Sequence, residues 1–144
     1  MASEDANDYV GVMFPILPEH CQRFFEGRKT VFVKYMSRES LPRRLHSGSR
    51  LFLYQSRSNR EIVGEARIVE MASATLEEVL ARFGDDVFLT RTELEKYSGT
   101  RKGKRMLVLV LEEARKYASS LKLDKSITMA GQYMTKKTLR ELKG

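Results

Sequence analysis

The sequence has few of the residue types on which cross-linked, metal-binding and membrane-spanning proteins depend. Its 144 residues include no tryptophan, three prolines, two histidines and a single cysteine, Cys21. One cysteine cannot form an internal disulfide, which predicts a reducing, cytoplasmic environment, and His20, His46 and Cys21 do not make up a zinc ligand set. No run of about 18 apolar residues is present, which argues against a transmembrane helix. We therefore expect a cytoplasmic protein with no cofactor, no metal and no membrane partner.

Positive charge is what the sequence has in excess. Lysine and arginine total 26 against 19 aspartate and glutamate, a formal net charge of +7. The first ten residues differ, because they carry Glu4, Asp5 and Asp8 and no lysine or arginine. We expect residues 1–8 to form a disordered acidic tail and residues 9–144 to form a single domain. A basic domain attracts polyanions, most often nucleic acid, although the charge could also serve solubility alone.

Apolar and β-branched segments predict strands, and capping motifs predict helices. The expected strands cover residues 9–16, 30–35, 50–54, 61–70 and 105–112. A helix should begin near Pro18 and bury a stripe that includes Cys21, as a packed core thiol. Two further helices should follow the capping boxes Thr75–Glu78 and Thr90–Glu93, and Thr135 could cap a last one. This order predicts an α+β domain or a partly open barrel.

Basic residues gather in several predicted turns. The clusters are Arg28 with Lys29, Arg43 with Arg44, Arg57 with Arg60, and the run of Arg101, Lys102, Lys104 and Arg105. Cations on loops are typical phosphate contacts of nucleic-acid-binding proteins. Each cluster alone is better explained as a solvated turn, whereas the clusters taken together with the net charge fit either explanation equally well. Tyr54 and Tyr133 could stack on bases, or they could be partly buried tyrosines of the core.

Glu65 is an unusual carboxylate, because it lies within a predicted strand that is otherwise well packed. Charged residues are rarely buried without a partner. Glu65 should therefore either face solvent, which is the commoner case, or line a cleft near Lys29.

Several motifs resemble the ASCH group of the PUA-like superfamily, and small archaeal members of unknown function in particular. The first is Leu17 to Tyr35, LPEHCQRFFEGRKTVFVKY, in which a short helix leads through a Gly-Arg-Lys-Thr turn into a strand. The second joins the strand Gly48–Tyr54 to the strand Ile62–Arg67, and residues 88–97 and 106–111 also resemble the group. The resemblance covers about residues 9 to 140 and implies the following fold: a pseudo-barrel of five to six mostly antiparallel strands with three to four short helices. It also implies that residues 115–123 continue a strand, although their propensity favours a helix.

The resemblance implies two functions. PUA-like domains use a cleft for RNA or modified nucleotides, whereas an ASCH subgroup hydrolyses acetylated cytidine with a lysine, a threonine and a strand glutamate. The lysine and glutamate correspond to Lys29 and Glu65, but the threonine position is Phe32 here. Thr30 is the available substitute. The loss of this threonine, the nucleophile or its activator, favours a noncatalytic RNA-binding module. The alternative is an amidohydrolase that uses Lys29 and Glu65 on an acylated nucleoside.

The sequence thus predicts a monomeric RNA-binding domain without catalytic residues. Its basic cleft would use these cations for phosphates: Arg28, Lys29, Lys34, Arg57, Arg60, Arg101, Lys102, Lys104 and Arg105. Tyr54 and Tyr133 would lie against bases.

Overall fold

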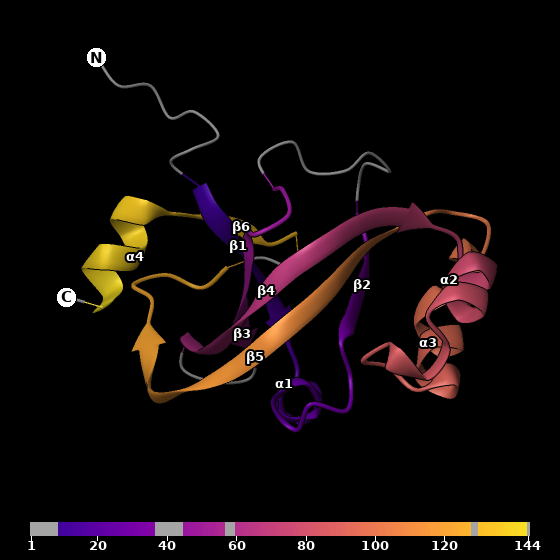
Figure 1. The fold of residues 1–144 in the computed structure, drawn as a ribbon, viewed down its shortest axis with the longest axis horizontal. Coiled ribbons are helices and arrows are strands. Elements are labelled where there is room, and N and C mark those ends of the chain that lie inside the picture. The colour runs from indigo at the N-terminus through magenta and orange to yellow at the C-terminus, as the bar shows by residue number, and fades with distance from the viewer. Residues whose placement is uncertain (1–8, 37–44, 57–59, 128–129, 144) are drawn as a thin grey trace, which may run out of the picture.

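The computed structural model describes residues 9–36, 45–56, 60–127 and 130–143. The predicted tail at residues 1–8, the Arg43–Arg44 pair and Arg57 lie outside the described residues. Within them the chain forms one mixed sheet and four α-helices (Figure 1). The strands are β1 (Tyr9–Ile16), β2 (Val31–Tyr35), β3 (Arg50–Gln55), β4 (Glu61–Ala74), β5 (Met106–Lys122) and β6 (Gln132–Thr135). The α-helices are α1 (Pro18–Phe25), α2 (Leu76–Arg82), α3 (Arg91–Ser98) and α4 (Lys136–Lys143), and two short 3₁₀ turns are η2 (Gly84–Asp86) and η3 (Gly99–Arg101).

The sheet has the order β2-β5-β4-β3-β1-β6. Only β1 and β3 pair in parallel among the described strands; the other neighbours are antiparallel. β2 and β6 lie at the two ends of this order and are not paired with each other, so the sheet that the described residues form does not close into a barrel. The predicted α+β pseudo-barrel of mostly antiparallel strands is therefore confirmed in its open form.

The β4–β5 pair forms the curved spine of the fold (Figure 1). Three register shifts interrupt its ladder, and one lies where Arg67 pairs with Glu112 but Glu65 pairs with Arg115. Glu113, the extra residue there, has φ 56°, the left-handed conformation typical of a β-bulge. Bulges increase twist and bend a strand, which lets β5 run on to Lys122. The predicted strand continuation over residues 115–123 is confirmed as far as Lys122.

Local signals account for the positions of the helices. Both capping boxes are present. The side chains of Thr75 and Thr90 each accept from the backbone N–H three residues later, and the carboxylates of Glu78 and Glu93 accept from the backbone N–H of Thr75 and Thr90. Thr135 Oγ1 accepts from the backbone N–H of Thr138 at 3.1 Å, as expected for a cap of α4. In the described residues no helix is long and apolar enough to cross a membrane.

The core consists of two clusters on opposite faces of the sheet. Leu51 and Leu53 belong to the larger cluster, whereas Phe52 and Tyr54 belong to the smaller one, and alternate residues of a strand point to opposite faces. Cys21, 1% exposed, packs in the larger cluster, and burial raises the pKa of its thiol to about 12. The prediction of a buried core thiol is confirmed.

Candidate functional site

A cleft of about 450 Å³ opens on the face of the larger cluster. It lies between the end of β1, α1, β2 and α3. Its lining residues are Pro15, Ile16, Leu17, His20, Phe32, Val33, Lys34, Ser56, Phe88, Leu89, Glu93, Lys96 and Tyr97. We call it the Lys34 cleft. Most of this lining is apolar or aromatic, with a few polar side chains, which is the usual make-up of a small-molecule site.

Stacked phenylalanines form the base of the Lys34 cleft. Phe32 stacks on Phe14 with ring centroids 5.3 Å apart and on Phe88 at 5.1 Å. Phe88 in turn stacks on Phe24 at 5.4 Å. Phe32 is 3% exposed. The residue at the predicted threonine position is therefore part of the core, and it supplies no hydroxyl group.

Lys34 brings a positive charge to the wall of the cleft. It is 8% exposed, and its Nζ lies 5.5 Å from the centroid of the Phe14 ring. Among the described residues, no carboxylate forms an ion pair with Lys34. Burial and the nearby charge of Arg101 lower its pKa. A largely buried lysine that lines a cleft, and that has no carboxylate partner in the described part of the chain, is a candidate for binding an anion or for proton transfer.

Arg101 is placed next to Lys34 by two tyrosines. Its guanidinium lies 4.3 Å from the centroid of Tyr35 and 4.9 Å from that of Tyr97, and it donates to the Tyr97 carbonyl at 2.6 Å. The Tyr97 hydroxyl accepts from the Tyr35 N–H at 2.8 Å. These contacts fix Arg101 and the Tyr97 ring at the side of the cleft.

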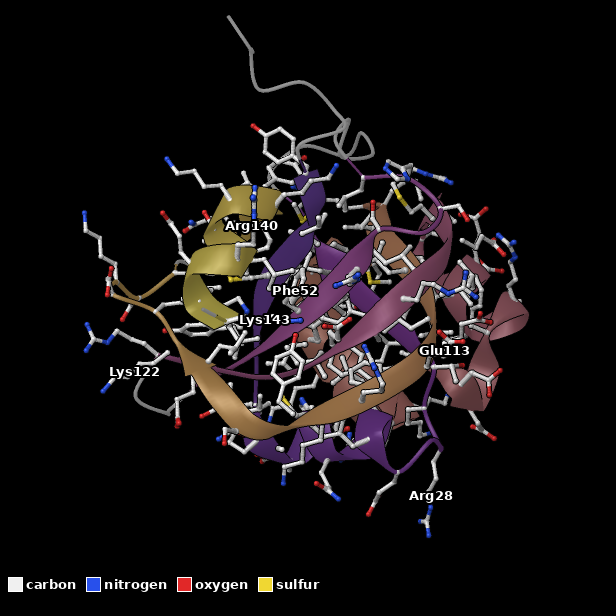
Figure 2. The ribbon with its side chains drawn as sticks, turned by 60° about the vertical axis from the view of Figure 1, so that its left-hand side comes forward. Arg28, Phe52, Glu113, Lys122, Arg140 and Lys143 are labelled. Carbon is white, nitrogen blue, oxygen red and sulfur yellow. The ribbon has the colours of Figure 1, made fainter. Side chains whose placement is uncertain are left out.

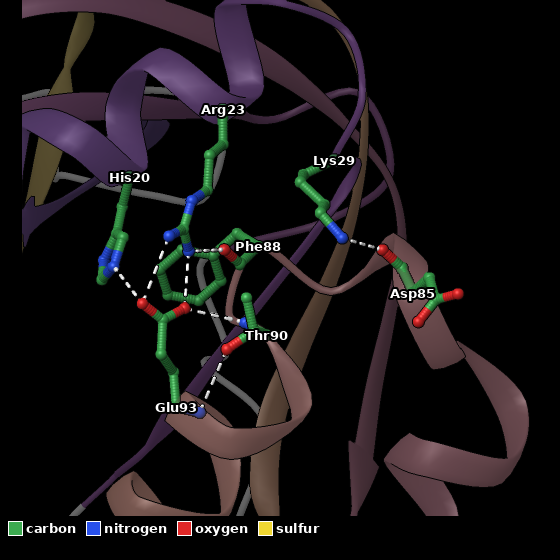
Figure 3. A network of polar contacts seen from close by, with 7 residues as sticks. All are labelled: His20, Arg23, Lys29, Asp85, Phe88, Thr90 and Glu93. Atoms are coloured by element: carbon green, nitrogen blue, oxygen red, sulfur yellow. Dashed lines mark hydrogen bonds and ion pairs between the residues drawn. The ribbon is translucent and has the colours of Figure 1, made fainter.

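An ion-pair network joins α1 to α3 at the mouth of the cleft (Figure 3). Arg23 donates to Glu93 Oε1 at 2.6 Å, to Glu93 Oε2 at 3.2 Å and to the Phe88 carbonyl at 2.9 Å. His20 Nε2 lies 3.7 Å from Glu93 Oε2, and its ring meets Phe88 edge-on. The Arg23 hydrogen bonds and the Thr90 N–H lower the pKa of Glu93 to about 2. Glu93 is therefore an anion at neutral pH and holds the cleft wall.

The shifted pKa of Glu93 predicts an acid dependence of stability. Because the folded value lies below the ordinary value of 4.5, the Glu93 contribution is complete above about pH 4.5 and is lost as the pH falls toward 2. We expect the melting temperature of Glu93→Gln to fall less than that of wild type over this pH range, as measured by circular dichroism. Glu95→Gln, on the exposed side of α3, is the control and should follow wild type. Parallel curves for wild type and Glu93→Gln would contradict the role of this carboxylate.

The structure does not bring Lys29 and Glu65 together through any contact it describes. Lys29 donates to the Asp85 carbonyl within η2 (Figure 3). Glu65 is 4% exposed and accepts from the Tyr117 hydroxyl at 2.7 Å, with Arg50 and Arg115 each at 3.4 Å. The interpretation of Glu65 as solvent-facing is wrong, because these three partners satisfy a buried carboxylate.

The other predicted binding residues are distributed over the molecule. Lys34 and Arg101 lie at the cleft, and exposed Lys102 and Lys104 lie in the turn after Arg101. The remaining ones lie elsewhere. Arg28 is exposed on the α1–β2 turn (Figure 2), and Arg60 donates to the Asp124 carbonyl at 2.6 Å. Arg105 contacts Ser73 and Glu78. Tyr54 is buried in the smaller cluster, and the Tyr133 ring meets the Tyr9 ring edge-on.

Sequence reasoning missed several residues of the cleft. His20, Glu93 and Tyr97 come from α1 and α3, which are separated by about seventy positions in the sequence. No local sequence pattern marks them as site residues. Glu93, for example, is explained by the capping box of α3 alone. Among the described residues, no group of three histidine, cysteine, aspartate or glutamate side chains could hold a metal ion.

Solved structures share this architecture. The ASCH protein of Zymomonas mobilis has a TM-score of 0.77 and is 16% identical, with 96% of this chain and 94% of that chain covered. The N-terminal domain of McrB from Staphylothermus marinus has a TM-score of 0.51 at 13% identity, covering 85% of this chain and 82% of that one. At these identities the similarity shows the fold, and the predicted ASCH-type fold is confirmed.

Sequence relatives identify the family. An uncharacterised protein of Methanocaldococcus jannaschii, MJECS03, is 28% identical over 95 residues, which cover 59% of this chain and 88% of that protein. The family described as "Domain of unknown function (DUF365)" matches residues 9–136, which include all six strands and the three helices before α4. The chain belongs to the DUF365 family and has an ASCH-type fold.

Proposed function

We propose that this domain is a noncatalytic RNA-binding module that takes one unpaired nucleotide into the Lys34 cleft. The observation that carries the proposal is the buried Lys34 ammonium in an aromatic cleft, with no carboxylate partner among the described residues. A buried charge without a counterion is costly, and a phosphate would neutralise it with charge-assisted hydrogen bonds. The cleft volume of about 450 Å³ lies within the usual range for small-molecule sites.

Surrounding residues suit a nucleotide. The rings of His20 and Tyr97 line the cleft and offer aromatic faces or edges to a base, and single-stranded RNA is generally recognised by stacking of splayed bases. Lys96 lines the same cleft and Arg101 lies beside it. With a net charge of +7, the chain also attracts a polyanion over long distances. The ASCH-type fold supports this assignment by analogy.

Fluorescence anisotropy with unpaired RNA, transfer RNA, duplex RNA and duplex DNA, at several salt concentrations, tests the proposal. We expect unpaired RNA and the loops of transfer RNA to bind more tightly than either duplex, because a base must leave its stack to enter the cleft. Equal binding of all four, or no binding at low salt, would contradict it.

The alternative is an amidohydrolase acting on an acylated nucleoside. Lys34 is the observation that favours it, because an amine with a lowered pKa can exchange a proton. It is less well supported, because Lys29 and Glu65 have separate partners and Phe32 replaces the threonine. As part of the same test, incubation with acetylcytidine should release no cytidine above the level of a Lys34→Met variant. Release above that level would favour the hydrolase.

A further inference from the structure

A second hollow, of about 550 Å³, lies on the other face of the sheet from the Lys34 cleft. It is formed with α4, whose Leu139 belongs to the smaller core cluster, whereas Phe32 of the cleft belongs to the larger one. Two apolar side chains and four cations line this α4 hollow: Val10, Leu139, Arg50, Lys136, Arg140 and Lys143. Among the described residues, its lining includes no carboxylate. Figure 2 shows Arg140 and Lys143 on α4, next to the sheet.

The buried carboxylate of Glu65 organises one side of the α4 hollow. Its Oε2 lies 3.4 Å from Arg50 Nε and 3.4 Å from Arg115 Nη2, so one anion is shared by two guanidinium groups. Lys143 Nζ lies 5.8 Å from the centroid of Tyr117, whose hydroxyl donates to Glu65. Burial, followed by the Glu65 hydrogen bond, raises the pKa of Tyr117 and keeps it a donor. Arg50 is thereby held in place while its side chain stays 41% exposed.

This group of side chains carries a clear excess of positive charge. Three cations of α4 together with Arg50 and Arg115 face the single charge of Glu65, which leaves a net charge of +4. Glu141, the acidic residue of α4, lines a different hollow with Lys122 and Lys125. An uncompensated cluster of this size favours a polyanionic ligand.

The spacing of the cations suits a row of phosphates. Lys136, Arg140 and Lys143 are four and three residues apart, which places them along one face of α4. At about 1.5 Å per residue they span about 10 Å, and one strand of a duplex carries about three phosphates over that length of its helix axis. Arg50 adds the planar fork that binds phosphate through two hydrogen bonds.

We propose that the α4 hollow binds the phosphate backbone of a nucleic-acid strand without reading its bases. This goes beyond the proposed nucleotide site, because it uses different residues on the other face of the sheet. A strand held here would be positioned on the protein whether or not a base enters the Lys34 cleft.

The test removes three positive charges from the hollow and compares the loss with a matched control. The variant is Lys136→Gln/Arg140→Gln/Lys143→Gln. The control, Arg91→Gln/Lys122→Gln/Lys125→Gln, removes the same number of lysines and arginines from exposed positions outside the hollow. Lys122 and Lys125 line the separate hollow that contains Glu141. Glutamine has a helix propensity close to those of lysine and arginine, so α4 should persist, which far-ultraviolet circular dichroism checks.

The probe is a fluorescent short oligouridylate, titrated at several salt concentrations. Each lost phosphate contact should reduce the salt slope of a single strand by about 0.7, so the hollow variant should lose about 2 units of slope. We expect its affinity at low salt to fall about tenfold or more, and that of the control to change less than about twofold, since dispersed charges act only at long range. Equal losses in the two variants would overturn the proposal.

Two further experiments distinguish the α4 hollow from the proposed nucleotide site. Polyglutamate of matched charge should compete poorly, and competition equal to that of unlabelled oligouridylate would overturn the assignment to phosphates. The hollow variant should bind cytidine monophosphate as wild type does, whereas Lys34→Met should lose only the share of one phosphate contact, about 0.7 unit of the salt slope for oligouridylate. If Lys34→Met removes the slope and the hollow variant does not, the backbone site is not the α4 hollow.

Discussion

Replacing Phe32 with threonine is expected to lower the free energy of unfolding by about 3–5 kcal/mol. Phe32 is 3% exposed and stacks between Phe14 and Phe88. The substitution removes the ring from both stacks, leaves a cavity and buries a hydroxyl group. Urea denaturation monitored by circular dichroism would measure the loss.

The control Phe32→Leu keeps an apolar side chain and should cost about 1–2 kcal/mol. A loss below about 1 kcal/mol for Phe32→Thr would contradict the packing role of this ring. The result also bears on function, because threonine is the residue that the amidohydrolase resemblance requires here. If Phe32 is needed for the core, this position cannot provide a catalytic hydroxyl without a change in the surrounding packing.

Replacing Lys34 with methionine is expected to leave the free energy of unfolding unchanged or to raise it, while nucleotide binding is weakened. Burial and the charge of Arg101 lower the pKa of Lys34, so the protonated side chain opposes folding. Methionine fills a similar volume without the charge. A lysine that serves only the fold would behave in the opposite way, since its removal would destabilise the protein.

The lowered pKa of Lys34 also predicts how the free energy of unfolding changes with pH. Between the lowered pKa of Lys34 and its ordinary value of 10.5, the unfolded chain binds a proton that the folded chain does not, so stability rises with pH. Lys34→Met should lack this alkaline rise in urea denaturation curves. Lys96→Met, which removes an exposed charge from the rim of the cleft, is the control and should retain it. An identical rise in all three proteins would contradict the burial of the charge.

The helices were the most predictable part of the fold, because their signals are local. The capping boxes at Thr75 and Thr90 mark helix starts within four residues. β6 was missed, since its four residues have no strand pattern of their own and become a strand by pairing with β1. The second half of β5 was predicted from the family resemblance against its helix propensity. Pairing with β4 overrides that propensity in the structure.

The candidate sites were less predictable than the fold. Lys34 is one of several cations predicted at the rim. Its burial, and the absence of a carboxylate partner among the described residues, depend on packing between distant segments. The cations of α4 had a visible signal, because Lys136, Arg140 and Lys143 follow helical spacing. The prediction omits these residues, because it places the phosphate contacts on cations in turns. Their grouping with Arg50 required the tertiary structure.

Isothermal titration calorimetry with cytidine monophosphate and with cytidine, for wild type and Lys34→Met, tests most directly whether the Lys34 cleft recognises a nucleotide. A charge-assisted hydrogen bond contributes about 1.5–3 kcal/mol, so the variant should bind the monophosphate about tenfold to a hundredfold more weakly. Cytidine, which lacks the phosphate, should bind both proteins equally weakly. Equal affinity of wild type and Lys34→Met for the monophosphate would contradict the account.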